Sequence, residues 1–205
     1  MLKIFVARHG QDLDNVKGIL NGRRDMPLSE KGIEQAGLVA AELQQLGIKF
    51  DKVYASPLQR AFRTAEVIAD MVCAPAPEIL DDLIERDFGV MTGKHRDEIE
   101  STCAPDVIKT DTIIYFLCPT GAETFPQLVE RARKVLRYIR EKHTDGNVLL
   151  VTHGDIGKMI YCAYYNLDWQ EILPMFHFGN SEILILSEDS EPDDVYLVRT
   201  AQYNA

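Results

Sequence analysis

Residues 2–10 read LKIFVARHG, an apolar run that ends in a basic pair and a glycine. The run predicts a buried strand, and the glycine after it lets the backbone turn and a ligand come close. Open α/β sheets bind ligands at the carboxyl ends of their strands. There Arg8 could donate hydrogen bonds to phosphoryl oxygens, and a neutral His9 could attack phosphorus through a ring nitrogen. We interpret the pair as a candidate phosphate site, with a capped turn at a strand end as the alternative.

A second stretch repeats this pattern. Residues 147–152 read NVLLVT, which predicts another buried strand, and His153 and Gly154 follow it directly. Two strands would therefore deliver two imidazoles to one edge of a sheet. This agreement favours a functional site over a chance tripeptide.

The order of strand and helix patterns predicts the fold class. Strand patterns at 2–7, 52–55 and 147–152 alternate with helix patterns over most of the 205 residues, and two further strand patterns follow at 182–186 and 195–200. The alternation indicates an α/β protein, a three-layer αβα sandwich with a mostly parallel sheet and an antiparallel final strand. We expect a single domain over 1–205, in which residues 86–122 contribute a small cap or lid.

Composition limits the partners and the compartment. A formal net charge of -10 argues against nucleic acid or an anionic membrane surface as a partner, because both require a basic face. There is no 18-residue apolar stretch, and the four scattered cysteines are typical of reduced thiols, so we expect a cytoplasmic protein. A small phosphorylated substrate stays compatible with this charge. The oligomeric state is not readable, although a homodimer through the sheet edge is permitted.

Two more charged residues are candidates for the site. Residues 56–60, SPLQR, predict a helix start with Ser56 as its cap, which places Arg60 one turn inside an anion-binding helix terminus. Glu85 follows two apolar residues. For each of the two charged side chains, a solvated surface position is the alternative.

The walls of the site are expected to come from two segments. Loop 11–27 is polar, and its Asn15, Asn21 and Gly22 could reach a ligand held by Arg8. The segment 101–120 contains the apolar run 113–118, which favours a partly apolar leaving group. The physiological substrate itself cannot be read from the sequence.

Together these motifs resemble the histidine phosphatase superfamily, which has the phosphoglycerate-mutase-like fold. The resemblance covers nearly the whole chain, and six motifs in family order carry it. They are RHG at 8–10 with Asn15, LSEKG at 28–32, SPLQRA at 56–61 with Thr64 and Ala65, LIE at 83–85, GAET at 121–124 and VTHG at 151–154.

The resemblance implies a metal-independent phosphomonoesterase. His9 would be the nucleophile and form a phosphohistidine, with its other ring nitrogen held by a backbone carbonyl. Arg8, Arg60 and His153 would bind the phosphoryl oxygens, with His153 as an imidazolium, so that no metal or other cofactor is needed. Glu85 would protonate the leaving oxygen and then act as a base, which requires a raised pKa. Asn15, Asn21, Gly22 and Gly154 are the expected substrate-binding residues.

A phosphoglycerate mutase-type phosphoryl transfer is the first alternative. Mutases of this family carry a tyrosine three residues after the acid and a pair of arginines that hold the substrate carboxylate. Here the first position is Phe88, and Lys109 is the only basic residue between Arg96 and Arg131. We therefore favour a phosphatase. Asp14 and Ala122 also depart from the common family pattern and affect only the expected pocket shape.

Two other classes of function remain as alternatives. A metal hydrolase could use His9, Asp12, His153 and Asp155, but Arg8 would repel the cation and the spacing matches no common metal site. A non-catalytic domain that binds a phosphorylated ligand would keep the same residues. Turnover of a generic aryl phosphate would separate such a binding domain from an enzyme.

Overall fold

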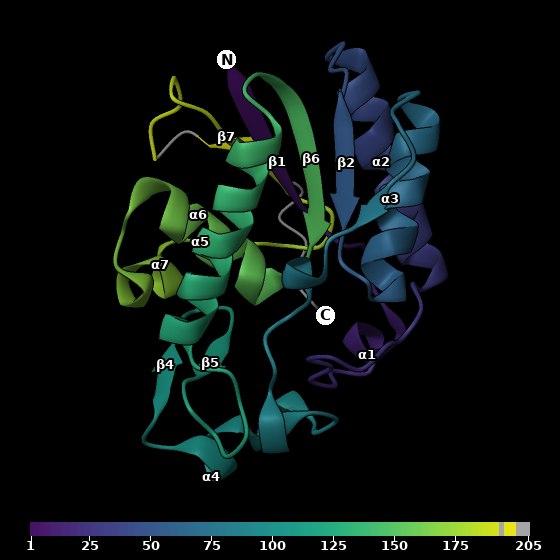
Figure 1. The fold of residues 1–205 in the computed structure, drawn as a ribbon. Helices are drawn as coiled ribbons and strands as arrows, with labels where there is room; N and C mark the ends of the chain where they lie inside the picture. Colours follow the sequence, from purple (N-terminus) through teal and green to yellow (C-terminus); the bar gives the residue numbers. More distant parts are fainter. Residues whose placement is uncertain (193–194, 200–205) are drawn as a thin grey trace.

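The computed structural model describes residues 1–192 and 195–199. Among these residues, six strands form one sheet in the order β3-β2-β6-β1-β7-β8 (Figure 1). The strands are β1 (Leu2–Arg8), β2 (Lys52–Ala55), β3 (Glu78–Ile79), β6 (Gly146–Thr152), β7 (Ile183–Leu186) and β8 (Tyr196–Val198). The central strand β1 is thus the first in the chain, and both of its neighbours come from the last third.

The register of the sheet places the two histidine motifs side by side. β1 pairs in parallel with β6 from Leu2↔Gly146 to Arg8↔Thr152, so the residues that follow both strands leave the same edge. β2 is parallel to β6 and to β3. β7 is antiparallel to β1, and β8 is antiparallel to β7, which confirms the mostly parallel sheet with an antiparallel addition. Residue 200, which the sequence placed in the last strand, lies outside the described residues.

Helices cover both faces of the sheet, which confirms the three-layer αβα sandwich (Figure 1). One face carries α2 (Glu30–Gln45) and α3 (Gln59–Met71), and the other carries α5 (Phe125–Lys142), α6 (Gly154–Tyr165) and α7 (Trp169–Met175). Side chains of a strand alternate between its two faces, so Phe5 and Ala7 join the core under α2 and α3, whereas Ile4 and Val6 join the core under α5 and α6.

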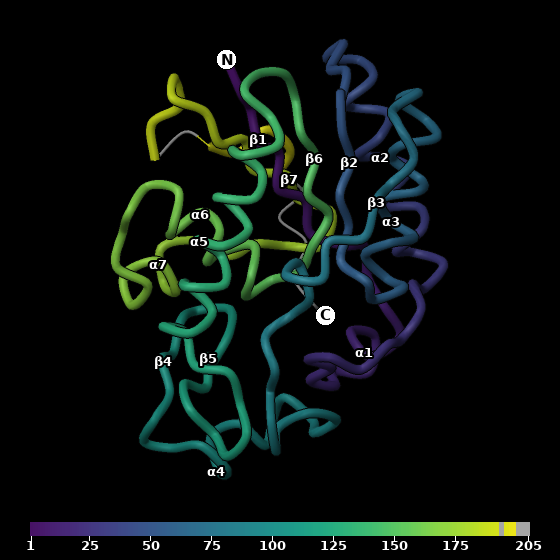
Figure 2. Tube along the Cα trace, in the orientation of Figure 1, coloured from purple at the N-terminus to yellow at the C-terminus, as the bar shows by residue number. Residues whose placement is uncertain are grey.

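The segment 86–122 builds a small unit at the carboxyl ends of the parallel strands (Figure 2). It contains the 3-10 helices η2 (Gly89–Met91) and η3 (Arg96–Glu98), the helix α4 (Ile99–Cys103) and a two-stranded antiparallel sheet of β4 (Val107–Lys109) and β5 (Ile114–Phe116). A separate apolar cluster, centred on Phe88, Met91, Ile99, Cys103 and Phe116, holds this unit together. The 3-10 helix η1 (Asp81–Leu83) leads from β3 into this unit, and the loop after α1 (Leu13–Val16) contacts it through a bridge between Ile19 and His95.

Two glycines allow the turn after β1 to touch helix α2. A Cβ atom on Gly10 would lie 2.3 Å from the carbonyl oxygen of Gly32, and a Cβ on Gly32 would lie 2.0 Å from that of Gln11. Real side chains do not approach backbone so closely, so both positions need glycine. The histidine after β1 is therefore held by backbone packed directly on backbone.

No helix in the described part of the chain is long and apolar enough to span a bilayer. The four cysteines are all free thiols.

Candidate active site

His9 lies directly after β1 and is buried, with 3% of its surface exposed. Its ring Nδ1–H donates to the carbonyl oxygen of Gly10 at 2.6 Å, the backbone contact that the family resemblance implies. The proton on Nδ1 leaves the lone pair on Nε2. Burial lowers the pKa of His9 well below its usual value, and the charges of Arg60 and Arg8 lower it further. His9 is therefore a neutral imidazole with a free nucleophilic nitrogen.

Arg60 lies in the first turn of α3 and is fully buried. Its Nη1 donates to the carbonyl oxygen of Arg24 at 2.6 Å, and its Nη2 donates to that of Gly22 at 2.8 Å. Its Nε lies 3.3 Å from His9 Nε2 and 3.3 Å from the carboxylate of Asp12. The guanidinium is thus fixed in orientation, with Nε aimed at the nucleophile.

Arg8 and His153 complete the positive side of the site. Arg8 Nη1 donates to the carbonyl oxygen of Phe178 at 2.5 Å. The rings of His153 and His9 have centroids 5.0 Å apart and planes inclined by 61°. His153 Nε2 lies 2.7 Å from the Ser56 hydroxyl, and its buried Nδ1 has no partner among the described residues. Side chains from three distant segments therefore converge on one point.

The surroundings of His153 favour its neutral form in the ligand-free protein, whereas the expected imidazolium concerns the protein with a phosphoryl group bound. Burial lowers the pKa of His153 well below its usual value, and Arg60, His9 and Arg8 add to the effect. A positive charge there would be both desolvated and repelled. His153 is therefore neutral until an anion binds beside it.

The side chain of Glu85 reaches the N-terminus of helix α6, where its carboxylate contacts backbone N–H groups. Its Oε1 accepts hydrogen bonds from the backbone N–H of Arg86 at 2.8 Å and of Ile156 at 3.2 Å, and its Oε2 accepts one from Asp155 N–H at 3.3 Å. Burial raises the pKa of Glu85, and the negative charge of Asp155 raises it further. The carboxyl group therefore has the direction of pKa shift that a proton donor near neutral pH requires.

The residues predicted to bind substrate lie around the same point, but three of them also support other side chains. Asn21 Nδ2 donates to the Asp12 carboxylate at 2.5 Å, and Gly22 binds Arg60 through its carbonyl oxygen. Asn15 Oδ1 accepts from the side chain of Asn180 at 3.3 Å. Gly154 faces Arg8, since a Cβ on it would lie 3.6 Å from the guanidinium carbon.

Sequence reasoning missed several supporting residues. Helix α3 begins at Gln59 after an N-cap at Leu58 that makes no side-chain bond, so the prediction of Ser56 as the cap is wrong. The Ser56 hydroxyl instead contacts His153. Asn180 donates to the His9 carbonyl oxygen at 3.1 Å from a loop that has no sequence pattern. The ion pair of Arg86 with Asp155, at 2.7 Å, had one usable signal, which is that each residue follows a predicted site motif.

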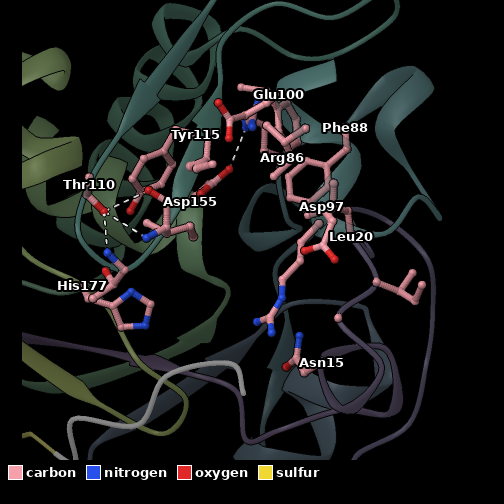
Figure 3. A pocket seen from close by; sticks show the side chains of 18 of the residues that line it. Asn15, Leu20, Arg86, Phe88, Asp97, Glu100, Thr110, Tyr115, Asp155 and His177 are labelled. Atoms are coloured by element: carbon pink, nitrogen blue, oxygen red, sulfur yellow. Dashed lines mark hydrogen bonds and ion pairs between the residues drawn. The ribbon is translucent and has the colours of Figure 1, made fainter. Parts of the chain in front are cut away.

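A cavity of about 690 Å³ opens beside these residues (Figure 3). Its walls include residues of 15–20 and 110–116, which belong to the two predicted segments, loop 11–27 and segment 101–120. Residues of 86–88 and 96–100, with Asp155 and His177, complete the walls. In Figure 3 the ion-paired Arg86 and Asp155 lie near the middle of the view. Thr110 and His177 lie on one side of them, and Phe88 and Leu20 lie on the other.

In the part of the chain that the structure describes, no group of three His, Cys, Asp or Glu is placed to hold a metal ion. The two aspartates of the metal-hydrolase alternative are both engaged elsewhere. Asp12 contacts Arg60 at 3.3 Å, and Asp155 contacts Arg86 at 2.7 Å. Guanidinium partners fit a phosphate site better than a cation site.

Comparisons with known proteins agree with this geometry. A model of the histidine phosphatase superfamily (branch 1) matches residues 4–199. A 2,3-bisphosphoglycerate-dependent phosphoglycerate mutase of Bartonella tribocorum (strain CIP 105476 / IBS 506) is 29% identical over 174 residues, which are 83% of this chain and 84% of that protein. Phosphoglycerate mutase-like protein 4 of Arabidopsis thaliana is 34% identical over 166 residues, which are 78% of this chain and 69% of that protein.

Among solved structures, the phosphoserine phosphatase of Entamoeba histolytica has a similar fold, with a TM-score of 0.74 and 23% identity over 90% of each chain. The matched family model spans almost all of the sequence, including every motif that supplies a side chain to the site. The chain therefore belongs to the histidine phosphatase superfamily.

Proposed function

We propose that the protein is a metal-independent phosphomonoesterase that works through a phosphohistidine on His9. The hydrogen bond from Nδ1 to the Gly10 carbonyl carries this proposal, because it leaves the Nε2 lone pair facing the point where Arg8, Arg60 and His153 converge. A ring nitrogen surrounded by buried positive groups is suited to attack a phosphoryl group whose negative charge those groups hold.

In the first step, the phosphoryl oxygens bind Arg8, Arg60 and His153. A phosphoryl oxygen replaces His9 Nε2 as the acceptor of the Arg60 Nε–H, and the lone pair of His9 Nε2 is then available for attack. The Nε2–P bond forms as the bond from phosphorus to the ester oxygen breaks, and Glu85 gives its proton to that leaving oxygen. The dianion also offsets the burial of His153, so this ring takes up a proton when substrate binds.

In the second step, the ionised Glu85 takes a proton from water. The resulting hydroxide attacks phosphorus, the Nε2–P bond breaks, and inorganic phosphate leaves. His9 returns to the neutral form with its proton on Nδ1. One carboxyl group thus serves as acid and then as base, and no proton is lost over the cycle.

The unit formed by residues 86–122, which we call the cap, favours hydrolysis over the mutase reaction that the sequence relatives are named for. Phe88 has no hydroxyl to offer a substrate, and it contacts Phe116 with ring centroids 5.0 Å apart. Lys109 is ion-paired with Glu100 and does not line the cavity. Two arginines, Arg86 and Arg96, line the cavity, but Arg86 is paired with Asp155 at 2.7 Å, so they do not form a two-arginine clamp for the carboxylate of a phosphoglycerate.

Turnover of an aryl phosphate with and without chelator tests the proposal. We expect phosphate release that is unchanged by chelator and reduced by at least about 10³-fold in His9→Ala. His143→Ala, at the far end of the sheet, is the matched control and should keep full activity. Quenching a labelled substrate in alkaline denaturant should trap a phosphoenzyme in Glu85→Gln, because its water-activating base is missing, and the trapped label should be stable to alkali and released by acid.

Four results would contradict the proposal. Loss of activity on chelation would indicate a metal enzyme, and full activity of His9→Ala would exclude His9 as the nucleophile. Tight phosphate binding with no turnover would indicate the non-catalytic binding domain. Interconversion of phosphoglycerates that outruns phosphate release would indicate a mutase.

A further inference from the structure

We propose that the alcohol esterified to the phosphate is an uncharged, partly apolar group of roughly drug-like size, and that a carboxylate on this group weakens turnover. The inference rests on the proposed phosphatase function and adds the chemical class of the substrate. The position, the size and the walls of the cavity beside the catalytic residues support this inference.

The position of the cavity makes it the leaving-group side of the site. Arg86 and Asp155 line it, and the backbone N–H groups of both donate to the Glu85 carboxylate at 2.8 and 3.3 Å. Asn15 lines it from the opposite segment and binds the side chain of Asn180, which also donates to the His9 carbonyl oxygen. The cavity is therefore lined by residues that contact the proton donor on one side and by a residue linked through Asn180 to the nucleophile on the other.

The size of the cavity exceeds what a small phosphorylated acid needs. Cavities of about 300–1,000 Å³ hold drug-sized ligands, and this one measures about 690 Å³. A three-carbon leaving group would leave most of this space to water. A larger alcohol would instead bury its surface against the walls, which is favourable.

One wall is apolar. Phe88 and Phe116 lie edge to face there, with Leu20 and Ile99 beside them, and both rings are nearly buried in the small core of the cap. Ile113 and Ile114 extend this surface along strand β5. An apolar face on the leaving group is the complement of such a wall.

The other wall is polar and carries several uncharged hydrogen-bonding groups. It carries the hydroxyls of Thr110, Thr112 and Tyr115 and the imidazole of His177 (Figure 3). Burial lowers the pKa of His177 to about 4, so the ring is neutral at physiological pH. The Tyr115 hydroxyl accepts from Lys158 at 3.0 Å, while Lys158 itself is not a lining residue. Hydroxyl, ether or amide groups on the leaving group would find partners here.

The charged residues that line the cavity are acidic on balance. Two arginines, Arg86 and Arg96, stand against four acids, which are Asp97, Glu100, Asp111 and Asp155. Asp155 is paired with Arg86, and Glu100 is paired with Lys109 outside the lining, so the balance is set by Arg96 against Asp97 and Asp111. Arg86 is engaged, because its Nε contacts Asp155 at 2.7 Å and its guanidinium carbon lies 5.0 and 4.5 Å from the centres of the Phe88 and Phe116 rings. A substrate carboxylate would therefore enter a negative field and lose its hydration.

Two aryl phosphates of equal shape test the inference. One bears a –CH2CONH2 group on the ring and the other bears –CH2COO⁻, so that they differ in charge but hardly in size or leaving-group strength. We expect kcat/KM to be about tenfold or more higher for the amide at low salt, and the ratio to shrink as salt screens the field. A ratio near one, or a preference for the acid, would overturn the inference.

Variants of the lining residues locate the effect. Asp97→Asn combined with Asp111→Asn should reduce the amide-to-acid ratio to about threefold or less, chiefly by raising kcat/KM for the acid. The matched control removes two exposed charges on the far helices, Glu34→Gln with Asp70→Asn, and should keep the original ratio. If the double lining variant also keeps that ratio, the acidic wall is not its cause and the inference fails.

Arg96 supplies the opposing test. It is the group that would receive a carboxylate if the cavity selected one. If the wild type prefers the acid and Arg96→Gln loses that preference, the cavity is a carboxylate site and the inference is overturned. In that case both esters are hydrolysed and the proposed function stands, whereas hydrolysis of neither ester, nor of a simple aryl phosphate, would overturn the function itself.

Discussion

At the scale of single residues, the site depends on buried charges that set one another's protonation. Glu85 is flanked by Asp155, which raises its pKa beyond the effect of burial, and Asp155 is in turn paired with Arg86. A general acid is active only while protonated, so activity falls as pH rises through its pKa. The upper limit of the active pH range should therefore depend on Asp155.

We predict that Asp155→Asn shifts the alkaline limb of kcat/KM for an alkyl phosphate to lower pH. The variant removes a negative charge beside Glu85 and leaves Arg86 unpaired, and both changes favour the ionised carboxylate. Activity near pH 8 should fall severalfold while activity near pH 6 changes less. An unmoved limb would show that Asp155 does not tune the acid.

Arg86→Met is the control with the opposite sign. It leaves Asp155 unpaired next to Glu85, so the alkaline limb should move to higher pH. A general loss of folding would lower activity at every pH in both variants and would not separate their profiles in opposite directions. The substrate's own titration is common to all three proteins and cancels.

At the scale of elements, the contact between the turn after β1 and helix α2 is the tightest constraint on the nucleophile. Gly32 lies in the first turn of α2, and any side chain on it would strike the Gln11 carbonyl. Gly37 lies in the same helix, but a Cβ on it would meet only the Met71 sulfur at 4.0 Å. One helix thus carries a required glycine and a replaceable one.

We predict opposite effects for alanine at these two positions. Gly32→Ala should lower the free energy of unfolding by about 2 kcal/mol or more and reduce kcat, because the backbone around His9 must move. Gly37→Ala should raise it by about 0.5–1 kcal/mol with unchanged kcat, because alanine costs less backbone entropy in a helix. Urea denaturation with turnover assays measures both, and equal effects would show that the contact does not matter.

At the scale of the whole molecule, the buried neutral histidines make stability depend on pH. The pKa values of His9 and His153 lie below their usual value in the folded state, so the unfolded chain binds protons that the folded one does not. Stability from these groups is present at neutral pH and is lost as pH falls below about 6.5. The raised pKa of Glu85 acts in the opposite direction over its own range.

The difference between wild type and His153→Asn isolates one of these groups. Below pH 6.5, one histidine contributes a slope of about 1.4 kcal/mol per pH unit to the free energy of unfolding. The variant should therefore lose about 1 kcal/mol less than the wild type between pH 6.5 and 5.5. Parallel stability curves would show that folding does not lower the pKa of His153.

The sequence carried the fold and the centre of the site because both depend on strong local patterns. Apolar strands ending in RHG and VTHG place His9 and His153 at one edge of any parallel sheet, and the structure brings the two rings to 5.0 Å. The protonation state of His153 was not readable, since it follows from burial and from arginines far away in the chain.

Supporting contacts were out of reach for a similar reason. A serine before a proline is typical of a helix cap, yet Ser56 uses its hydroxyl on His153, across 97 positions of sequence. Asn180 and the Phe178 carbonyl lie in a loop whose residue types carry no spacing rule. Such contacts arise from tertiary packing alone.

The strand order has a consequence for how the molecule is made. β1 emerges first during synthesis, but its partners β6 and β7 are translated last, and Arg8 and His9 accept backbone hydrogen bonds from Ser181. A nascent chain that ends before these strands has no support for the nucleophile on either flank. Until β6, β7 and Ser181 have been made and have folded against β1, the polypeptide therefore lacks the contacts that hold His9 in place.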